Sequence, residues 1–463
     1  MIITVSDPVK HSEGMNAYVT YKVTTKTDLP RFDHSHFYVH RRYSDFCWLQ
    51  EQLMQLFPGL VVPPLPEKQV MRRFNEPFLS QRQRSLEKFL ARIAAHEQLR
   101  DNGVVKAFLE LESLDGVRDA LAKRAGSAAG GEPSSAGSAP GAGSSNAQGG
   151  GSTLANSLWQ WASAATSTLQ SKMAGPPPAQ RAKTEDDVRF DEIRAYVTSL
   201  EPQMVAVHKH VHGLVDKGKD MAQALFDFGL AFTLLGQAES DGLGEAMAQL
   251  GQCADKLSRI TAVEADKERQ FFDEPIRDYV RLVRQVKLAL DVRTAKMAAY
   301  EQALAELDAK KAERERVARA AGGQAPGGAA RSAAGGSHLD PGSHQSRVAA
   351  VEEELKAAQA ASEAARAEFE LVTSRVFHEV ERFKRDKLAD LKGIVLDYVQ
   401  LQIEYNQQVE QSWRDVLPAL QALGVQDAAP AVAAAAAPPT SPPTVPAADQ
   451  HAATTADEEE AFV

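Results

Sequence analysis

The chain has 463 residues, with 52 Lys and Arg against 62 Asp and Glu, and a formal net charge of -10. That length allows two or three domains, and two cysteines far apart in helical patterns, Cys47 and Cys253, argue for a reducing compartment and against a disulfide scaffold or a structural zinc site. No run of about 18 apolar residues occurs, and the start lacks a signal-peptide pattern. We therefore expect a cytoplasmic protein whose membrane contact is peripheral, with no nucleic-acid partner.

The negative charge is unevenly distributed. Residues 1–125 carry 18 Lys and Arg against 15 Asp and Glu, whereas residues 421–463 carry six acids and no Lys or Arg. The field at a binding site depends on charges within about 8 Å at physiological salt. An acidic chain can therefore still bind an anionic lipid through its N-terminal region.

The first 120 residues alternate as short strands and then become helical, which predicts a small α+β domain. Arg41 and Arg42 end the third expected strand, where two guanidinium groups could hold a phosphate bidentately while Tyr43 packs against a ring. Ser44 is the expected N-cap of the following helix, whose first backbone donors would add to anion binding.

A second helix is expected over residues 79–93, and one of its positions breaks the apolar pattern. Its apolar stripe consists of Leu79, Leu86, Phe89, Leu90 and Ile93. Arg82 lies on that stripe, where a hydrophobic residue would be expected. A charge on a core-facing stripe needs a partner, so Arg82 is a second candidate for an anion site.

The segments RRYSDF at 41–46 and PPLPEK at 63–68 resemble the PX domain, and the resemblance continues to about residue 120. Further segments resemble a sorting nexin of the PX-BAR type, closest to the plant form: SDPVK at 6–10, AYVTYKVTTKTDLP at 17–30, DFG at 227–229, LLG at 234–236, EPIRDYVR at 274–281 and LPALQA at 417–422. The resemblance implies a PX domain followed by an all-α BAR domain, which forms a dimeric crescent of three long helices.

The resemblance also implies a site for phosphatidylinositol 3-phosphate. Arg42 would bind the 3-phosphate, and Tyr43, followed by Ser44, would support the inositol ring. Lys68 would reach the 1-phosphate, and Arg82 would hydrogen-bond the far hydroxyls. The residues alone leave another interpretation open, in which Arg42 and Arg82 pair with acids such as Asp45 or Glu87.

Two segments are candidates for membrane insertion. The first is the loop after Lys68, where the apolar residues Val70, Met71 and Phe74 alternate with Arg72 and Arg73. The alternative is a surface loop whose Phe74 packs back on the domain.

The second segment, residues 152–175, reads as an amphipathic helix with an almost uncharged polar face. Its apolar side includes Leu158 and Trp161, with Trp159 at the border. Insertion would then depend on packing defects of curved bilayers, which makes the segment a candidate curvature sensor. The alternative is an extra core helix. The Gly, Ser and Ala residues of 121–151 predict a flexible tether, so Arg42→Ala should abolish selective lipid binding while leaving the helical dimer folded.

Residues 185–422 are helical in pattern, with a low-complexity insertion at 321–346 at the expected crescent tip and a disordered acidic tail at 423–463. Helices of about 55 to 75 residues would extend roughly 80 to 110 Å, too long for one compact monomer. We expect a homodimer, or a heterodimer with another PX-BAR sorting nexin. Pro202 and Pro275 are expected to bend these helices.

Other residues of the helical region have weaker interpretations. Basic side chains could form a membrane-facing surface or could be solvated and balanced by acids: Lys209, Lys217, Lys219, Arg382, Lys384, Arg385, Lys387 and Lys392. The basic residues beside the insertion are also candidates. His208 and His212 have the spacing of a zinc pair but are expected on a solvated helix face. The segment 213–220 resembles a phosphate-binding loop but is expected to be helical. No metal and no cofactor is expected.

The resemblance implies a non-enzymatic coat protein on the cytosolic face of endosomes. It would bind phosphatidylinositol 3-phosphate, form tubules and return sorting receptors toward the trans-Golgi network, with the retromer core as a possible partner. Two alternatives remain open. One is an endosomal adaptor that recruits proteins without remodelling membranes, and the other is an enzyme targeted by a PX domain, for which little foldable sequence remains.

Overall fold

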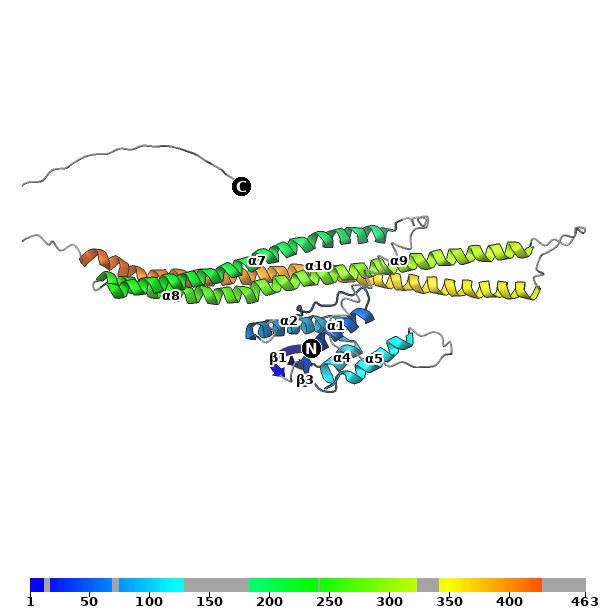
Figure 1. The fold of residues 1–463 in the computed structure, drawn as a ribbon, viewed down its shortest axis with the longest axis horizontal. Coiled ribbons are helices and arrows are strands. Elements are labelled where there is room, and N and C mark those ends of the chain that lie inside the picture. The colour runs from blue at the N-terminus through cyan, green and yellow to red at the C-terminus, as the bar shows by residue number, and fades with distance from the viewer. Residues whose placement is uncertain (12–16, 69–74, 129–182, 240–241, 323–340, 427–463) are drawn as a thin grey trace, which may run out of the picture.

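The computed structural model describes residues 1–11, 17–68, 75–128, 183–239, 242–322 and 341–426. They form an N-terminal domain, residues 1–128, and a helical domain, residues 183–426 (Figure 1). The helical domain is a long rod, and the N-terminal domain lies against one side of it. This architecture confirms the expected fold class of an α+β domain followed by an all-α coil.

The N-terminal domain begins with a three-stranded antiparallel sheet in the order β1-β2-β3. Its strands are β1 (Ile2–His11), β2 (Tyr18–Lys26) and β3 (His36–Arg42). The register places Val5 opposite Val23 and Val23 opposite Val39, and all three side chains are buried. Because side chains alternate between the two faces of a strand, this row fixes which β3 residues point inward, including Arg41.

Five helices complete the domain: α1 (Tyr43–Leu56), α2 (Glu76–Ala95), α3 (Glu97–Arg100), α4 (Gly103–Glu110) and α5 (Asp115–Ala128). Phe46 of α1 meets Phe89 of α2 and Phe108 of α4 in edge-on ring contacts, with centroids 6.4 and 5.1 Å away. The predicted α2 stripe is buried, and Arg82 is buried with it. Helix α5 continues past residue 120, where the tether was expected to begin.

Three long helices make up the helical domain. The first is α7 (Glu185–Ala238), and the second runs without interruption through α8 (Gly242–Glu268), η2 (Arg269–Asp273) and α9 (Glu274–Gly322). The third, α10 (Pro341–Gln426), has 86 residues. At 1.5 Å per residue α10 spans about 130 Å.

The two prolines expected to bend the helices occupy different settings. Pro202 lies inside α7, as predicted. Pro275 instead lies at the second position of α9, directly after the π-helical turn η2. Because α8, η2 and α9 form one continuous helix, Pro275 is still inside a helix, and the irregularity at this point belongs to the π turn as well as to the proline.

Glycines allow α7 and α8 to pack backbone against backbone. A Cβ added to Gly229 would lie 2.8 Å from the Gly251 carbonyl oxygen, and one added to Gly236 would lie 2.6 Å from the Gly244 carbonyl oxygen. Real Cβ atoms do not approach that closely. The DFG and LLG segments of the sequence therefore mark a close helix crossing.

Ion pairs dock the N-terminal domain on the helical domain. Asp278 of α9 lies 2.9 Å from Lys88 Nζ and 2.7 Å from Arg92 Nη2, both on α2. Glu274, one turn earlier, accepts hydrogen bonds from Arg84 Nε and Nη2 at 3.0 and 2.7 Å. Burial would raise the pKa of Asp278, but Arg92 and Lys88 outweigh it and hold the pKa below its usual value.

The docking surface also contains a buried carboxylate and apolar contacts. Glu379 of α10, 1% exposed, accepts hydrogen bonds from the Val61 backbone N–H and from His96 Nε2, both at 3.1 Å. Val61 belongs to the hydrophobic core of the helical domain, together with Val372 and other residues. The two domains therefore share a polar and apolar interface as well as the connection along the chain, whose residues 129–151 lie outside the described part. That an Arg42 substitution leaves the helical dimer folded stays a prediction.

Candidate functional site

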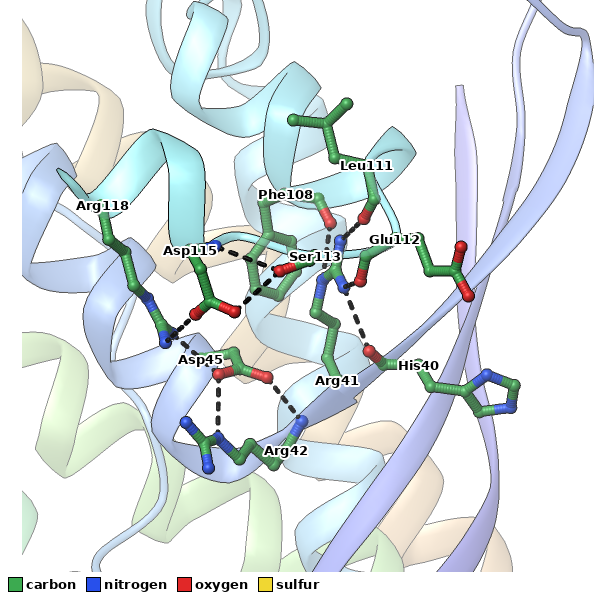
Figure 2. A network of polar contacts seen from close by, with 10 residues as sticks. All are labelled: His40, Arg41, Arg42, Asp45, Phe108, Leu111, Glu112, Ser113, Asp115 and Arg118. Atoms are coloured by element: carbon green, nitrogen blue, oxygen red, sulfur yellow. Dashed lines mark hydrogen bonds and ion pairs between the residues drawn. The ribbon is translucent and has the colours of Figure 1, made fainter. Parts of the chain in front are cut away.

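The two arginines at the end of β3 have different environments. Arg41 is 2% exposed and donates to backbone carbonyls of His40 at 3.1 Å, Phe108 at 2.9 Å and Glu112 at 2.9 Å, as well as to that of Leu111 (Figure 2). The expectation that both guanidinium groups bind phosphate is therefore wrong for Arg41. Four of its five N–H donors are used inside the domain.

Arg41 has a structural role instead. The carbonyls of Phe108 and Leu111 lie at the C-terminal end of α4, where the helix leaves acceptors unsatisfied and carries partial negative charge. Burial lowers the pKa of Arg41 to about 10, and nearby Asp45 opposes that shift. The side chain therefore remains a cation at neutral pH and ties α4 to the sheet.

Arg42 is exposed and only partly engaged. Its side chain is 50% exposed, and its Nε lies 3.2 Å from Asp45 Oδ1. The same Asp45 oxygen lies 2.8 Å from Arg118 Nη2 of α5 (Figure 2). The alternative interpretation, pairing with Asp45, thus holds for one edge of the Arg42 guanidinium. Its terminal Nη1 and Nη2 have no hydrogen bond or ion pair to the part of the chain described above, so they are open to a ligand.

Arg118 was not predicted from the sequence. It lies in α5, beyond the quoted PX motifs, and no local pattern marks it. By sharing Asp45, Arg118 draws part of that negative charge away from Arg42. Its guanidinium also lies over the Trp48 ring, 5.2 Å from the centroid, which fixes it in place.

The expected N-cap at Ser44 is wrong. Helix α1 begins at Tyr43 with Arg42 in the N-cap position, and the Arg42 backbone N–H donates to Asp45 Oδ2 at 2.9 Å. Asp45 therefore both caps the helix start and holds the Arg42 side chain. Ser44 is exposed on the first turn.

Arg82 and Tyr43 form the centre of the site. The Arg82 guanidinium carbon lies 4.3 Å from the centroids of the Tyr43 and Phe78 rings. Its Nη2 donates to the Glu67 carbonyl at 3.2 Å, while its Nε is buried without a hydrogen-bond partner in the described structure. Burial lowers the pKa of Arg82. The buried charge of Arg82 is thus surrounded by two rings, one carbonyl and the nearby Tyr21 hydroxyl. Glu87, the acid considered as its partner, instead accepts from the Val5 N–H.

Tyr43 connects the site to the proline-rich turn. Its hydroxyl donates to the Pro66 carbonyl, and burial raises the pKa of that hydroxyl. Lys68, two residues later, is exposed and lies within electrostatic range of Cys47, one turn along α1 from Tyr43. The structure therefore places Arg82 against the Tyr43 ring and Lys68 near the same turn of α1, while Arg42, the residue before Tyr43, is held by Asp45.

The residues predicted to insert into membrane lie outside the described part of the chain. These are Val70, Met71 and Phe74 of the loop after Lys68, and Leu158, Trp159 and Trp161 of the segment 152–175. Their insertion stays a prediction.

Several basic side chains of the helical domain are balanced by acids. Lys219 lies 3.2 Å from Asp266, and Lys384 lies 3.3 Å from Glu381. Arg382 contacts Glu379 at 2.9 Å. The tip residues follow the same pattern, with Lys310 Nζ 2.6 Å from a carboxylate oxygen of Glu354. For these positions the interpretation as charge-balanced helix faces is the better one.

His208 and His212 of α7 differ in exposure: His208 is partly buried, whereas the His212 side chain is 51% exposed. His208 Nε2 and His212 Nδ1 lie 3.3 and 3.5 Å from the same oxygen of Asp273, a residue of η2 that is 1% exposed. Burial lowers the pKa of His208. The prediction of a solvated face is wrong for His208, which is 26% exposed. Within the described ranges no cluster of three or more side chains is arranged to hold a metal ion.

The helical domain exposes large apolar side chains on several of its helices. They include Phe226, Leu230 and Leu234 of α7, Leu243 of α8, and Val395, Val399 and Ile403 of α10. Such residues in an elongated coil are typical of a surface that pairs with another chain. Of the helices described here, none combines the length and the apolar character that a membrane crossing requires.

The fold is a small α+β domain docked on a long three-helix coil, and comparisons with known proteins agree. The family model "PX domain" matches residues 29–112, and the model "Vps5 C terminal like" matches residues 164–334 and 329–419, more than half of the chain together. Sorting nexin 1 of Arabidopsis thaliana is 27% identical over 427 residues, covering 91% of this chain and 92% of the relative.

Sorting nexin-1 of Homo sapiens is 27% identical over 436 residues, covering 91% of this chain and 72% of the relative. The solved structure of the SNX-BAR Mvp1 tetramer is 16% identical with a TM-score of 0.49, covering 90% of this chain and 99% of that chain.

The chain belongs to the PX-BAR family of sorting nexins. Members are non-enzymatic membrane-trafficking proteins that bind phosphoinositide-containing membranes peripherally, respond to membrane curvature and dimerise.

Proposed function

We propose that the pocket around Tyr43 binds the headgroup of phosphatidylinositol 3-phosphate on endosomal membranes. The observation that carries the proposal is the half-exposed Arg42 guanidinium, whose Nε is oriented by Asp45 while its terminal nitrogens remain open. Such a fork matches a phosphate bidentately. Tyr43 would support the inositol ring, and Lys68 would meet the 1-phosphate.

Arg82 has the position of a group that reads hydroxyls. Its guanidinium is held between two rings, and its Nε is buried without a partner in the described structure, so a headgroup hydroxyl could satisfy a donor that the protein leaves unused. Together, Arg42, Arg82 and Lys68 would favour a compact, multiply charged ligand over a single carboxylate.

The helical domain is proposed to shape the membrane. The exposed apolar side chains of α7, α8 and α10 would pair with a second copy of the chain or with another PX-BAR sorting nexin. A dimer presents two pockets, so avidity increases residence on a membrane without any new contact. Insertion of residues 152–175 and of the loop at 70–74 would add curvature. The resulting tubules would return sorting receptors from endosomes toward the trans-Golgi network, with the retromer core as partner.

Flotation of the purified protein with vesicles tests lipid recognition. The vesicles contain neutral and anionic carrier lipids, with or without phosphatidylinositol 3-phosphate. The intact chain should float mainly with vesicles that contain this lipid, and Arg42→Met should lose at least about tenfold in apparent affinity, the scale of one charge-assisted hydrogen bond.

The matched control is Arg100→Met, which removes a cation from α3 that pairs with Asp101. It should bind as the intact chain does. Equal binding by the Arg42→Met protein and the intact chain would contradict the proposed pocket.

A second function keeps the same lipid but omits remodelling. In that case the long helices recruit proteins as an endosomal adaptor, and the paired charges on the helical domain favour it, because paired cations contribute less to membrane attraction. Tubule formation separates the two functions.

A further inference from the structure

The EPIRDYVR segment at 274–281 has a role in docking that leaves one residue unexplained. Glu274 and Asp278 hold α2 through Arg84, Lys88 and Arg92. Positions 274, 278 and 281 are four and three residues apart, so they lie on one face of α9. Arg281 is therefore on the face that meets the N-terminal domain, and the ion pairs beside it fix the backbone there.

Arg281 lacks the partners that its neighbours have. Arg277, one turn earlier, reaches Asp273 at 3.3 Å. The Arg281 side chain is partly buried, and its Nε has neither solvent nor a hydrogen-bond partner in the described ranges. Leaving a buried donor unsatisfied is costly, and such a group in a native structure calls for an explanation.

The surroundings of Arg281 connect it to the pocket. Burial and Arg277 lower the pKa of Arg281, whereas the charges of Glu67, Asp278 and Tyr43 raise it, so Arg281 lies within electrostatic range of two pocket residues. Glu67 contributes the carbonyl that accepts from Arg82 and directly precedes Lys68. Arg281 is thus near the Pro66–Lys68 turn.

We propose that Arg281 of the helical domain donates to a phosphate of the headgroup held in the N-terminal domain, so that one binding site is built from both domains. The inference rests on the proposed function, since it names a further binding residue of the same pocket. The phosphate concerned is the one beside the Pro66–Lys68 turn. Docking by Glu274 and Asp278 then becomes a condition for full affinity.

Calorimetric titration of the full chain with soluble dibutanoyl phosphatidylinositol 3-phosphate tests this without a membrane surface. Arg281→Met keeps the length of the side chain and removes its charge, and it should weaken binding about tenfold or more. Arg281→Lys should recover most of that loss. Arg284→Met is the matched control: this residue lies one turn later, pairs with Glu201 at 3.3 Å, and should not change affinity.

Binding by Arg42→Met and hydrogen exchange of Arg281→Met show which of the two proposals fails if Arg281→Met binds unexpectedly. If Arg42→Met binds the soluble lipid like the intact chain, the proposed function fails. If Arg42→Met loses binding while Arg281→Met does not, only the role of Arg281 fails. Hydrogen exchange of α2 in Arg281→Met should stay as in the intact chain, and a loss of protection there would overturn the direct role in favour of a docking role.

A docking variant completes the test. The triple substitution Glu274→Gln, Asp278→Asn, Glu379→Ala keeps every proposed site residue of the N-terminal domain but removes the three acids that dock it on α9 and α10. It should lower affinity by the same factor as Arg281→Met, and adding Arg281→Met to it should have no further effect. Full affinity in the triple variant would contradict a site shared by the two domains.

Discussion

Glu379→Ala should detach the N-terminal domain from the coil while both hydrophobic cores remain folded. Glu379 is 1% exposed and accepts from the Val61 N–H, from His96 and from Arg382. Apart from Val61, which packs in the helical core, the two domains have separate core clusters, so the loss should affect the interface between them. Arg382 keeps a second acid, Asp386, at 3.9 Å.

The magnitude follows from the groups left unpaired. Removing the acceptor leaves a buried N–H and a buried imidazole without partners, at about 1 to 3 kcal/mol each. Breaking a buried ionic contact by removing one partner costs about 3 to 5 kcal/mol. We therefore expect the free energy of opening this interface to fall by about 3 to 5 kcal/mol, which corresponds to a factor on the order of 100 to 4,000 in the open population.

Hydrogen exchange read by mass spectrometry measures that population through the amides of Val61 and of α2. The control is Glu381→Ala, two residues along α10, whose carboxylate is 54% exposed and contacts Arg189 and Lys384. Exposed pairs contribute about 0 to 1 kcal/mol, so this control should exchange as the intact chain does. Equal protection of Val61 in the two variants would refute the role given to Glu379.

The remaining predictions concern the coil and the interface. Gly229→Ala should lower the thermal midpoint, because its Cβ would meet the Gly251 carbonyl at 2.8 Å. Gly213→Ala, whose Cβ would have nothing within 4 Å, should instead stabilise the helix by about 0.5 to 1 kcal/mol. A higher midpoint for Gly229→Ala than for Gly213→Ala in calorimetry would contradict the close helix crossing. The pKa of Asp278 is lowered in the docked state, so its ionised carboxylate stabilises docking above the ordinary aspartate pKa of 3.8. This stabilisation is lost as the pH falls through the lower pKa of the docked state. Hydrogen exchange of α2 in Asp278→Asn should therefore change less between pH 6 and pH 3 than in the intact chain. Burial raises the pKa of Glu264, so its ionised form opposes folding above pH 4.5. Glu264→Gln should therefore raise the unfolding midpoint at pH 7 and lose that advantage near pH 4. Equal midpoints of the variant and the intact chain at pH 7 would contradict this role of Glu264.

Local patterns predicted much of the fold. Alternation over the strands, the apolar stripe of α2 and the helical period beyond residue 185 each follow from one stretch of chain, and the structure confirms them. Alternation alone also separates Arg41 from Arg42, since neighbours on a strand face opposite sides. The prediction that both arginines face one phosphate conflicts with this alternation.

Long-range contacts explain what could not be predicted. Glu379 and Val61 are 318 positions apart, and no local period brings them together. The sharing of Asp45 by Arg42 and Arg118 depends on where α5 packs. The EPIRDYVR segment was recognisable as a motif, yet its ion pairs to α2 appear only when the domains are assembled.

One molecule is proposed both to recognise the headgroup and to curve the membrane. Electron microscopy tests this directly, with vesicles that contain phosphatidylinositol 3-phosphate and are saturated with protein. We predict tubules of uniform diameter with the intact chain and bare, round vesicles with Arg42→Met. Dense coverage of round vesicles by the intact chain, without tubules, would contradict the remodelling function and leave the adaptor.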